Sequence, residues 1–260
     1  MKNKEDFEKI YNFRQLVKRY EKFKENIAFK YKEKSEIKEI SYEQYVYDIK
    51  CMAEFVLDRD VERVAIIGNN RYEWCVTYMG VTNAGKIIIP LDKALTNIEI
   101  EKLLKRSRAD AIVYDEKYQQ AVNEAVNQGC SIKYKICMDN IDGEDIIKYK
   151  DAINRGKEIY NCDKTRHDDM KIYDDKMYIM LFTSGTTDEP KAVMLSQKNV
   201  CENITAYPYN FKIYQTDTLL SFLPIHHTFE CSITFIYGTY CGATVAFCEG
   251  LRYIADNLKE

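Results

Sequence analysis

Several features that would set this chain apart from ordinary globular proteins are missing from its sequence. Only 10 of the 260 residues are glycine and 4 are proline, which excludes a collagen-like or low-complexity chain. The longest apolar stretches, such as residues 87–91 and 178–182, are far shorter than the roughly 20 residues that span a bilayer. No transmembrane helix is therefore expected, and peripheral contact with a membrane stays open. Positive and negative charges nearly balance, with 38 Lys and Arg against 41 Asp and Glu, so nothing predicts binding to nucleic acid.

Disulfide and secretion signals are also missing. The nine cysteines are spread along the chain without any C-x-x-C pair, which predicts reduced thiols rather than a disulfide framework. No apolar segment of a secretory signal follows the polar residues 1–6, so we expect a cytoplasmic protein. With 46% hydrophobic and 30% charged residues, the chain is long enough to bury a sizeable core in one or two domains.

A regular alternation of apolar runs and helical stretches occupies residues 64–138. The apolar runs are rich in β-branched residues, and Thr96-Asn97-Ile98-Glu99 is a capping box that begins one of the helices. Because strand and helix alternate, the region predicts an α/β fold with a doubly wound, mostly parallel sheet flanked by helices. We divide the chain into a first α/β subdomain over residues 1–170 and the start of an incomplete second subdomain over residues 171–260.

The segment from Phe182 to Lys191 has the composition of a phosphate-binding loop. It holds four hydroxyl side chains, one glycine and one lysine, directly after an apolar strand. Backbone N–H groups around Gly185 and the hydroxyls can donate to phosphate oxygens, and Lys191 can neutralise part of their charge. A Walker A loop is excluded, because its lysine follows glycine and precedes Ser or Thr, whereas Lys191 lies between Pro190 and Ala192. The alternative is a polar turn between two strands.

A second polar cluster is the segment Leu223-Pro224-Ile225-His226-His227-Thr228-Phe229-Glu230. If this segment is helical, i, i+4 spacing pairs His226 with Glu230 or His227 with Cys231, and metal ligands use that spacing. We expect no metal site, because the chain has only three histidines and no second group of ligands. A partly buried pair of histidines that is satisfied by hydrogen bonds is the simpler structural alternative.

The residue order in both segments resembles the adenylate-forming superfamily of acyl-CoA synthetases, luciferases and peptide-synthetase adenylation domains. The string TSGTT, Pro190-Lys191 and the segment Val193-Met194-Leu195-Ser196-x-x-Asn199 are similar to its phosphate-loop signature. The histidine segment is most similar to the long-chain fatty acyl-CoA synthetases. The resemblance implies that six residues close over the β- and γ-phosphates of ATP: Thr183, Ser184, Gly185, Thr186, Thr187 and Lys191. It also implies that His227 faces the acyl or adenylate group and that Phe229 helps to form the pocket wall.

Three positions depart from the family pattern. Asp188 and Ala192 replace residues that are usually or often glycine, and Gln197 replaces a residue that is commonly histidine. A carboxylate at position 188 would repel phosphate oxygens by about 1 kcal/mol or more at a few ångströms. We therefore expect Asp188 to weaken phosphate affinity and to leave the fold intact.

For the parent enzyme, the resemblance implies ATP-dependent activation of a fatty acid through an acyl-adenylate to acyl-CoA. The small-molecule partners are ATP, the fatty acid and CoA, with a Mg2+ ligand expected beyond Glu260. The later family motifs are absent and the chain stops inside a helix predicted over residues 251–260, so we expect an amino-terminal fragment without ligase activity. The alternatives are a stand-alone, catalytically inactive nucleotide- or acyl-binding module and an interaction domain. No motif specifies the acyl chain length or the oligomeric state.

Overall fold

The computed structural model describes residues 8–34, 36–143, 145–164, 166–183 and 190–259. Its strands are β1 (Ile27–Glu33), β2 (Glu36–Ser41), β3 (Arg63–Ile67), β4 (Ile87–Pro90), β5 (Ala111–Tyr114), β6 (Tyr134–Cys137), β7 (Ile146–Lys148), β8 (Ile179–Thr183), β9 (Lys191–Leu195), β10 (Thr218–Ser221) and β11 (Thr244–Phe247). Its α-helices are α1 (Phe13–Tyr20), α2 (Tyr42–Asp58), α3 (Tyr72–Asn83), α4 (Asn97–Ser107), α5 (Gln119–Asn127), α6 (Tyr149–Cys162), α7 (Gln197–Ala206), α8 (Thr228–Glu230), α9 (Gly238–Tyr240) and α10 (Ile254–Asn257). Short 3₁₀ turns are η1 (Glu116–Tyr118), η2 (Tyr207–Tyr209) and η4 (Leu251–Tyr253), and η3 (Cys231–Tyr237) is a π-helical stretch between α8 and α9.

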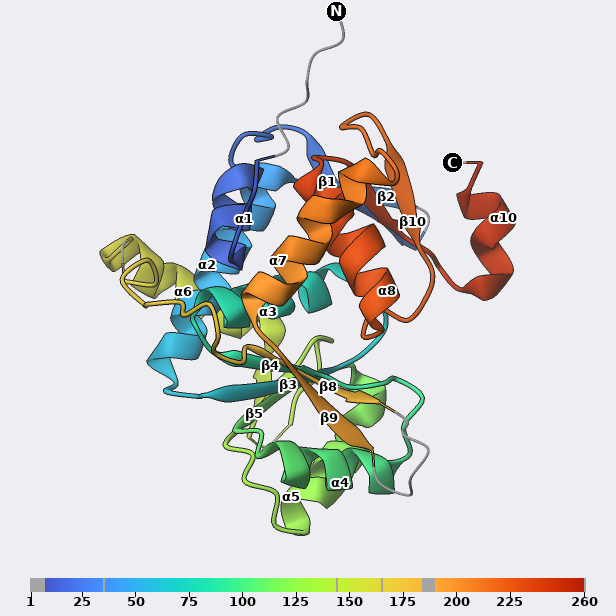
Figure 1. Ribbon diagram of the computed structural model, residues 1–260. Helices are drawn as coiled ribbons and strands as arrows, with labels where there is room; N and C mark the ends of the chain where they lie inside the picture. The colour runs from blue at the N-terminus through green and yellow to red at the C-terminus, as the bar shows by residue number, and fades with distance from the viewer. Residues whose placement is uncertain (1–7, 35, 144, 165, 184–189, 260) are drawn as a thin grey trace, which may run out of the picture.

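Two sheets organise these elements. The larger has seven strands in the order β7-β6-β5-β3-β4-β8-β9, all parallel to their neighbours except β9, which is antiparallel to β8. The smaller has the order β10-β11-β1-β2, with β1 parallel to β11 and antiparallel to β2. Figure 1 shows the smaller sheet at the top, the larger sheet below it, and helices between them. The predicted α/β class, with a mostly parallel sheet flanked by helices, is confirmed.

Both faces of the larger sheet are buried. Successive residues of a strand point to opposite faces. On β3, Val64 and Ile66 belong to the core that includes α1, α2 and α3, whereas Ala65 and Ile67 belong to the core that includes α4 and α5. The two helices of the second core lie beneath the sheet in Figure 1. Burial on both faces explains why residues 64–67 form a continuous apolar run without alternation.

The sequence specifies where two helices begin. The Thr96 hydroxyl accepts a hydrogen bond from the amide of Glu99, and the Glu99 carboxylate accepts one from the amide of Thr96 at 2.8 Å, so the capping box that begins α4 is confirmed. The Ser41 hydroxyl accepts a hydrogen bond from the amide of Gln44 at 3.1 Å and caps α2. Such caps satisfy amides that have no partner inside their own helix.

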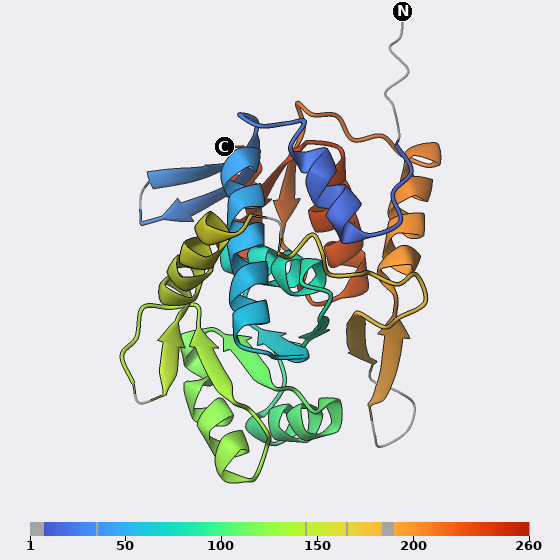
Figure 2. The same cartoon turned by 90° about the vertical axis from the view of Figure 1, so that its left-hand side faces the viewer.

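Helix α2 is the longest helix of the described chain and contacts both α3 and α6. Figure 2 shows α6 lying along it. The contact depends on Gly156, because a Cβ atom built at this position would lie 1.8 Å from the carbonyl oxygen of Cys51 on α2. The absence of a side chain at Gly156 therefore lets the two backbones touch.

The two sheets do not divide at residue 170. Strands β8 and β9 extend the larger sheet, whereas β1 and β2 join β10 and β11, with Phe29 opposite Val245. The division into residues 1–170 and 171–260 therefore stays a prediction about subdomains. The helix predicted over 251–260 is shorter than expected, since the described residues form only η4 and α10 there. None of the described helices is long and apolar enough to cross a membrane.

Candidate active site

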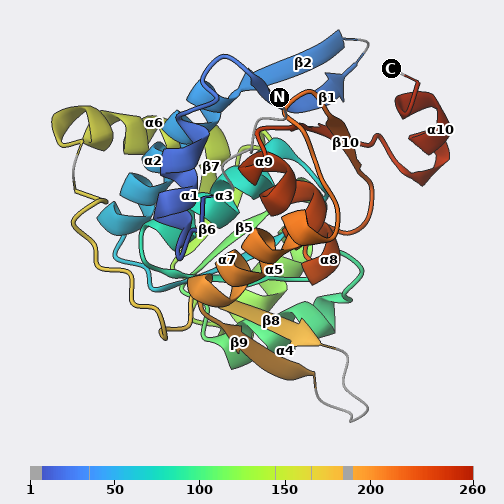
Figure 3. The same cartoon turned by 45° about the horizontal axis from the view of Figure 1, so that its top comes forward.

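The two ends of the predicted phosphate loop lie side by side on the larger sheet. Thr183 ends β8, Lys191 begins β9, and the two residues are directly opposite each other in the antiparallel ladder. Opposite residues of such a pair point to the same face, so the Thr183 and Lys191 side chains start from the same face of the hairpin, and both residues are exposed. Figure 3 shows this hairpin projecting at the lower end of the molecule. The remaining predicted phosphate ligands, Ser184, Gly185, Thr186 and Thr187, lie outside the described residues, as does Asp188.

A cleft of about 320 Å³ brings the two predicted motifs together. Thr183 and Pro190 line it from the β8–β9 hairpin, His226 and His227 line it from the histidine segment, and Asp92 lines it from the loop after β4. Strands β3, β4 and β8 are parallel, so the segments that follow them meet at the same edge of the sheet. Clefts outside the carboxyl ends of parallel strands are the usual ligand sites of α/β folds.

A smaller cavity of about 140 Å³ lies behind the cleft. Its walls come from β8, β9, α3 and α7, and they are mostly apolar, with Tyr78, Leu181 and Val200 among them. Four residues, Pro90, Leu181, His226 and Thr228, line both the cavity and the cleft. They lie between a mostly apolar compartment and one that Thr183 and Pro190 line. That arrangement suits a ligand with an apolar part and a polar or charged part.

The two adjacent histidines have different surroundings. His226 is partly buried, with Nε2 3.5 Å from a carboxylate oxygen of Asp92. Burial lowers the pKa of His226 below its ordinary value; Asp92 opposes this change, while His227 and Lys93 add to it. His227 is exposed and caps the helix that begins at Thr228, where its Nδ1 accepts a hydrogen bond from the Phe229 amide at 3.4 Å.

The predicted acyl-pocket residues occupy unequal positions. His227 lines the cleft, but Phe229 is 56% exposed and lines neither the cleft nor the cavity behind it. Asp92 and His226 also line the cleft, although the sequence assigned neither of them to the nucleotide or acyl site. Their contribution depends on contacts between distant segments, and no local pattern in the sequence indicates it.

The metal-site alternative finds no support in the arrangement of the described residues. Helix α8 begins at Thr228, so His226 lies before the helix that carries Glu230. Glu230 is buried, and one of its carboxylate oxygens accepts a hydrogen bond from Thr234 at 3.0 Å. Within the ranges that the structure describes, no group of three His, Cys, Asp or Glu side chains could hold a metal ion.

Gln197 has a structural role that the sequence did not indicate. It is buried at the start of α7, where its Oε1 accepts a hydrogen bond from the amide of Phe13 at 2.8 Å. Its Nε2 donates to the carbonyl of Thr82, also at 2.8 Å. The side chain thereby joins the start of α1 and the end of α3 to the helix that follows the phosphate-loop hairpin.

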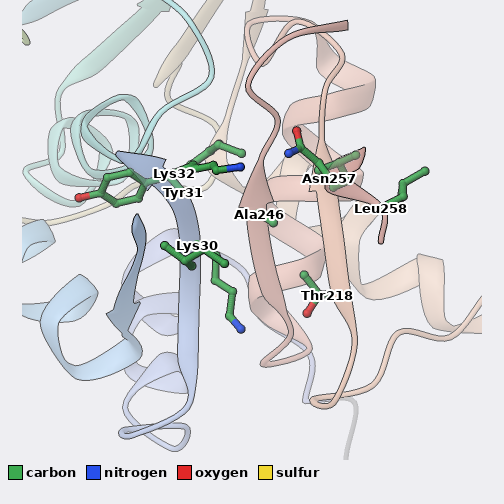
Figure 4. Close-up of a pocket in the computed structure, with 10 residues that line it drawn as sticks. Lys30, Tyr31, Lys32, Thr218, Ala246, Asn257 and Leu258 are labelled. Atoms are coloured by element: carbon green, nitrogen blue, oxygen red, sulfur yellow. The ribbon is translucent and has the colours of Figure 1, made fainter. Parts of the chain in front are cut away.

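A separate hollow of about 190 Å³ lies on the smaller sheet beside α10 (Figure 4). Lys30 and Lys32 line it from β1, together with apolar side chains of neighbouring strands. Both lysines already have carboxylate partners, since Lys30 lies 2.9 Å from Glu39 and Lys32 lies 3.4 Å from Glu249. Unlike the cleft, this hollow receives no residue from either predicted motif.

Solved acyl-CoA ligases share this architecture. A putative long-chain-fatty-acid CoA ligase from Rhodopseudomonas palustris matches with a TM-score of 0.78 at 17% identity, over 91% of this chain and 57% of that one. The anthranilate CoA ligase AuaEII, solved with anthranoyl-AMP, matches with a TM-score of 0.81 at 16% identity, over 96% of this chain and 47% of that one. At these identities the comparison shows the fold alone.

The chain belongs to the AMP-binding enzyme family, whose model matches residues 16–259. Long-chain-fatty-acid–CoA ligase 5 of Mus musculus is 27% identical over 215 residues, which cover 75% of this chain and 30% of the mouse protein. Fatty acyl-CoA synthetase B of Dictyostelium discoideum is 22% identical over 224 residues, which cover 81% of this chain and 32% of that protein. The chain thus spans about a third of the length of these curated relatives. The predicted membership of the adenylate-forming superfamily is confirmed.

Proposed function

We propose that this chain supplies the phosphate-binding and carboxylate-activating side of a fatty acyl-CoA ligase. The observation that best supports this proposal is the cleft that Thr183 and Pro190 of the phosphate-loop hairpin line together with His226 and His227. The fatty-acid relatives support the substrate class. In the complete reaction the fatty acid carboxylate attacks the α-phosphate of ATP and releases pyrophosphate, and the CoA thiol then displaces AMP. Mg2+ and CoA belong to this proposal, as does a cytoplasmic location.

The described residues suggest how the charges are handled. The transferring phosphate chain carries several negative charges, and preorganised donors stabilise them best where water is partly excluded. Lys191 supplies one positive charge beside the Thr183 hydroxyl at the mouth of the loop. His227 borders the cleft from the opposite motif, where it can donate to a carboxylate or an acyl-adenylate oxygen. The mostly apolar cavity behind His226 suits the first part of an acyl chain.

Calorimetric titration of ATP into the 260-residue chain tests the nucleotide part of the proposal. Lys191→Ala removes a charge that would contact the phosphates, and a charge-assisted hydrogen bond contributes about 1.5–3 kcal/mol. The variant should therefore bind ATP about tenfold more weakly or worse. Lys150→Ala is the matched control, because Lys150 is an exposed lysine on α6, outside the phosphate-loop hairpin that carries Lys191. Equal ATP affinity of the Lys191→Ala variant and the parent would contradict the assignment.

A coupled assay of acyl-CoA formation tests whether these 260 residues alone can complete the ligase reaction. Because the chain spans about a third of its curated relatives, we expect the 260 residues alone to bind nucleotide without completing the ligase reaction. The assay contains ATP, Mg2+, CoA and a long-chain fatty acid. Turnover by the purified chain would show that these residues suffice for catalysis and would overturn this part of the proposal.

A further inference from the structure

The segment that carries both histidines follows β10 of the smaller sheet and is held by the amide side chain of Asn70, which lies in the loop after β3 of the larger sheet. It runs from Ser221, the last residue of β10, to the start of α8. Asn70 donates from Nδ2 to the Ser221 hydroxyl at 2.9 Å and to the Leu223 carbonyl at 2.6 Å. Its Oδ1 accepts a hydrogen bond from the Ile225 amide at 3.1 Å. Both the nitrogen and the oxygen of the Asn70 amide therefore form hydrogen bonds with the five residues that precede His226.

Asn70 is itself firmly placed, because the residues on either side of it are anchored. The amide of Asn69 donates to a carboxylate oxygen of Asp115 at 2.7 Å. The guanidinium of Arg71 contacts Asp115 at 3.1 Å and Asp139 at 2.7 Å. These aspartates follow β5 and β6, so the loop after β3 is fixed to the carboxyl ends of two neighbouring strands.

A second point of attachment comes from the loop after β4. The carboxylate of Asp92 accepts a hydrogen bond from the Ala94 amide at 2.8 Å, and the same oxygen lies 3.5 Å from Nε2 of His226. Strands β3 and β4 are adjacent and parallel, so Asn70 and Asp92 lie at the same edge of the larger sheet. The histidine segment therefore meets two fixed polar groups, one before His226 and one at His226.

Apolar packing alone does not hold this segment. Phe222 is 40% exposed and Leu223 is 36% exposed, which leaves Ile225 as the only fully buried apolar side chain between Ser221 and His226. The backbone itself contributes two hydrogen bonds, from the Cys248 amide to the Ser221 carbonyl and from the His227 amide to the Pro224 carbonyl, both at 3.0 Å. The Asn70 amide is thus the main directional restraint on the path of the chain into the two histidines.

We propose that Asn70 is a positioning residue for the ligase reaction, which fixes His226 and His227 at the wall of the cleft, with Asp92 as the second contact at His226. The assignment rests on the proposed function, because that function gives the two histidines their place beside the acyl or adenylate group. Asn70 itself lines neither the cleft nor the cavity behind it. Its effect on a ligand passes through the histidines.

Imidazole NMR signals measured across a pH titration test this role in the whole 260-residue chain. The chain has only three histidines, and the third, His167, is buried beside Glu54 and lines neither the cleft nor the cavity behind it, so it serves as an internal reference. In Asn70→Ala the released segment gains access to water, which relieves the burial that lowers the pKa of His226. The His226 titration midpoint should rise toward the ordinary histidine value, the His227 signals should shift, and His167 should stay unchanged.

Two further variants separate positioning from general stability. Asn69→Ala is the matched control, because the Asn69 side chain is exposed and its anchoring amide is kept, and its imidazole signals should match those of the parent. Asn70→Asp keeps an acceptor for the Ile225 amide but loses the donors, so it should displace the His226 and His227 signals even if Asn70→Ala folds poorly. Parent-like His226 and His227 signals in a folded Asn70→Ala or Asn70→Asp protein would overturn the inference. These measurements need no nucleotide, so a failure of the ATP titration is a separate result.

Discussion

Replacing Gly156 with alanine sets two opposing effects against each other at the contact between α2 and α6. Alanine has the higher helix propensity and would stabilise an isolated helix by about 1 kcal/mol relative to glycine. In the folded chain, however, the added Cβ would lie 1.8 Å from the Cys51 carbonyl oxygen and 2.6 Å from the carbonyl carbon of the same residue. Backbone atoms of a neighbouring helix cannot rotate away as a flexible side chain can.

The clash should outweigh the gain in propensity. A contact of 1.8 Å must open by more than about 1 Å to reach an ordinary separation, so α6 has to move away from α2 along the whole contact. A gap of 0.5–1 Å already forfeits roughly a quarter to a half of the dispersion energy of the atoms that line it. Overpacking of this kind costs about 1–3 kcal/mol. After the propensity gain, we expect a net loss of up to about 2 kcal/mol in the free energy of unfolding of Gly156→Ala.

Urea unfolding followed by circular dichroism measures this difference. Asn154→Ala is the matched control, because Asn154 lies on the same helix with an exposed side chain and gains propensity without a clash. The control should be as stable as the parent or more stable by a few tenths of a kcal/mol. If Gly156→Ala matched the control in stability, α2 and α6 would not meet at this glycine, and the packing argument would fail.

Two further predictions concern buried carboxylates. Glu54→Ala should lower the free energy of unfolding by about 1–3 kcal/mol in urea titrations. The reason is that the buried His167 loses the Glu54 oxygen that contacts its amide at 3.1 Å and its Nδ1 at 2.9 Å. Glu54→Gln keeps an acceptor for these groups and should cost less. Burial raises the pKa of Glu230, although Ser221 and Thr234 oppose the change. The folded state therefore holds this proton more tightly than the unfolded state, and stability falls as pH rises above the ordinary glutamate pKa. Glu230→Gln should therefore gain stability over the parent as pH rises from 4 to 7, and a gain that is independent of pH would contradict the argument.

Local chemistry made much of the larger sheet predictable from the sequence. The continuous apolar run at residues 64–67, the capping box at Thr96 and the apolar strand before the phosphate loop each reflect short-range patterns, and all three are found. The sequence did not indicate strand β7, because its three residues, Ile146 to Lys148, are too few to show a periodic pattern. The strand is defined by its parallel pairing with β6. The pairing of β1 with β11 was also not predictable from local patterns, because Phe29 and Val245 are more than two hundred residues apart in the sequence.

For the candidate site, motif order located the chemistry, and tertiary contacts decided which residues meet. The sequence placed Thr183, Lys191 and His227, and the structure brings Thr183 and His227 into one cleft. The sequence alone could not place Asp92 at the site. Asp92 reaches His226 only because β4 lies beside β3 and β8 in the sheet. Phe229 illustrates the reverse, since family order assigned it to the pocket wall, while the described chain leaves it mostly exposed.

The departure at Gln197 has a physical explanation in the ends of two helices. The Phe13 amide is the first of α1 and has no partner inside its own helix. The Thr82 carbonyl, near the end of α3, accepts a hydrogen bond from Gln197 in addition to one from the Gly85 amide. A neutral histidine and a glutamine both offer an acceptor and an N–H donor, so either can join two such groups. Glutamine at position 197 thus performs a bridging task for which a neutral histidine is also chemically equipped. Gln197→Leu, which can neither accept nor donate, should separate α1 from α7 and destabilise the fold by about 1–3 kcal/mol.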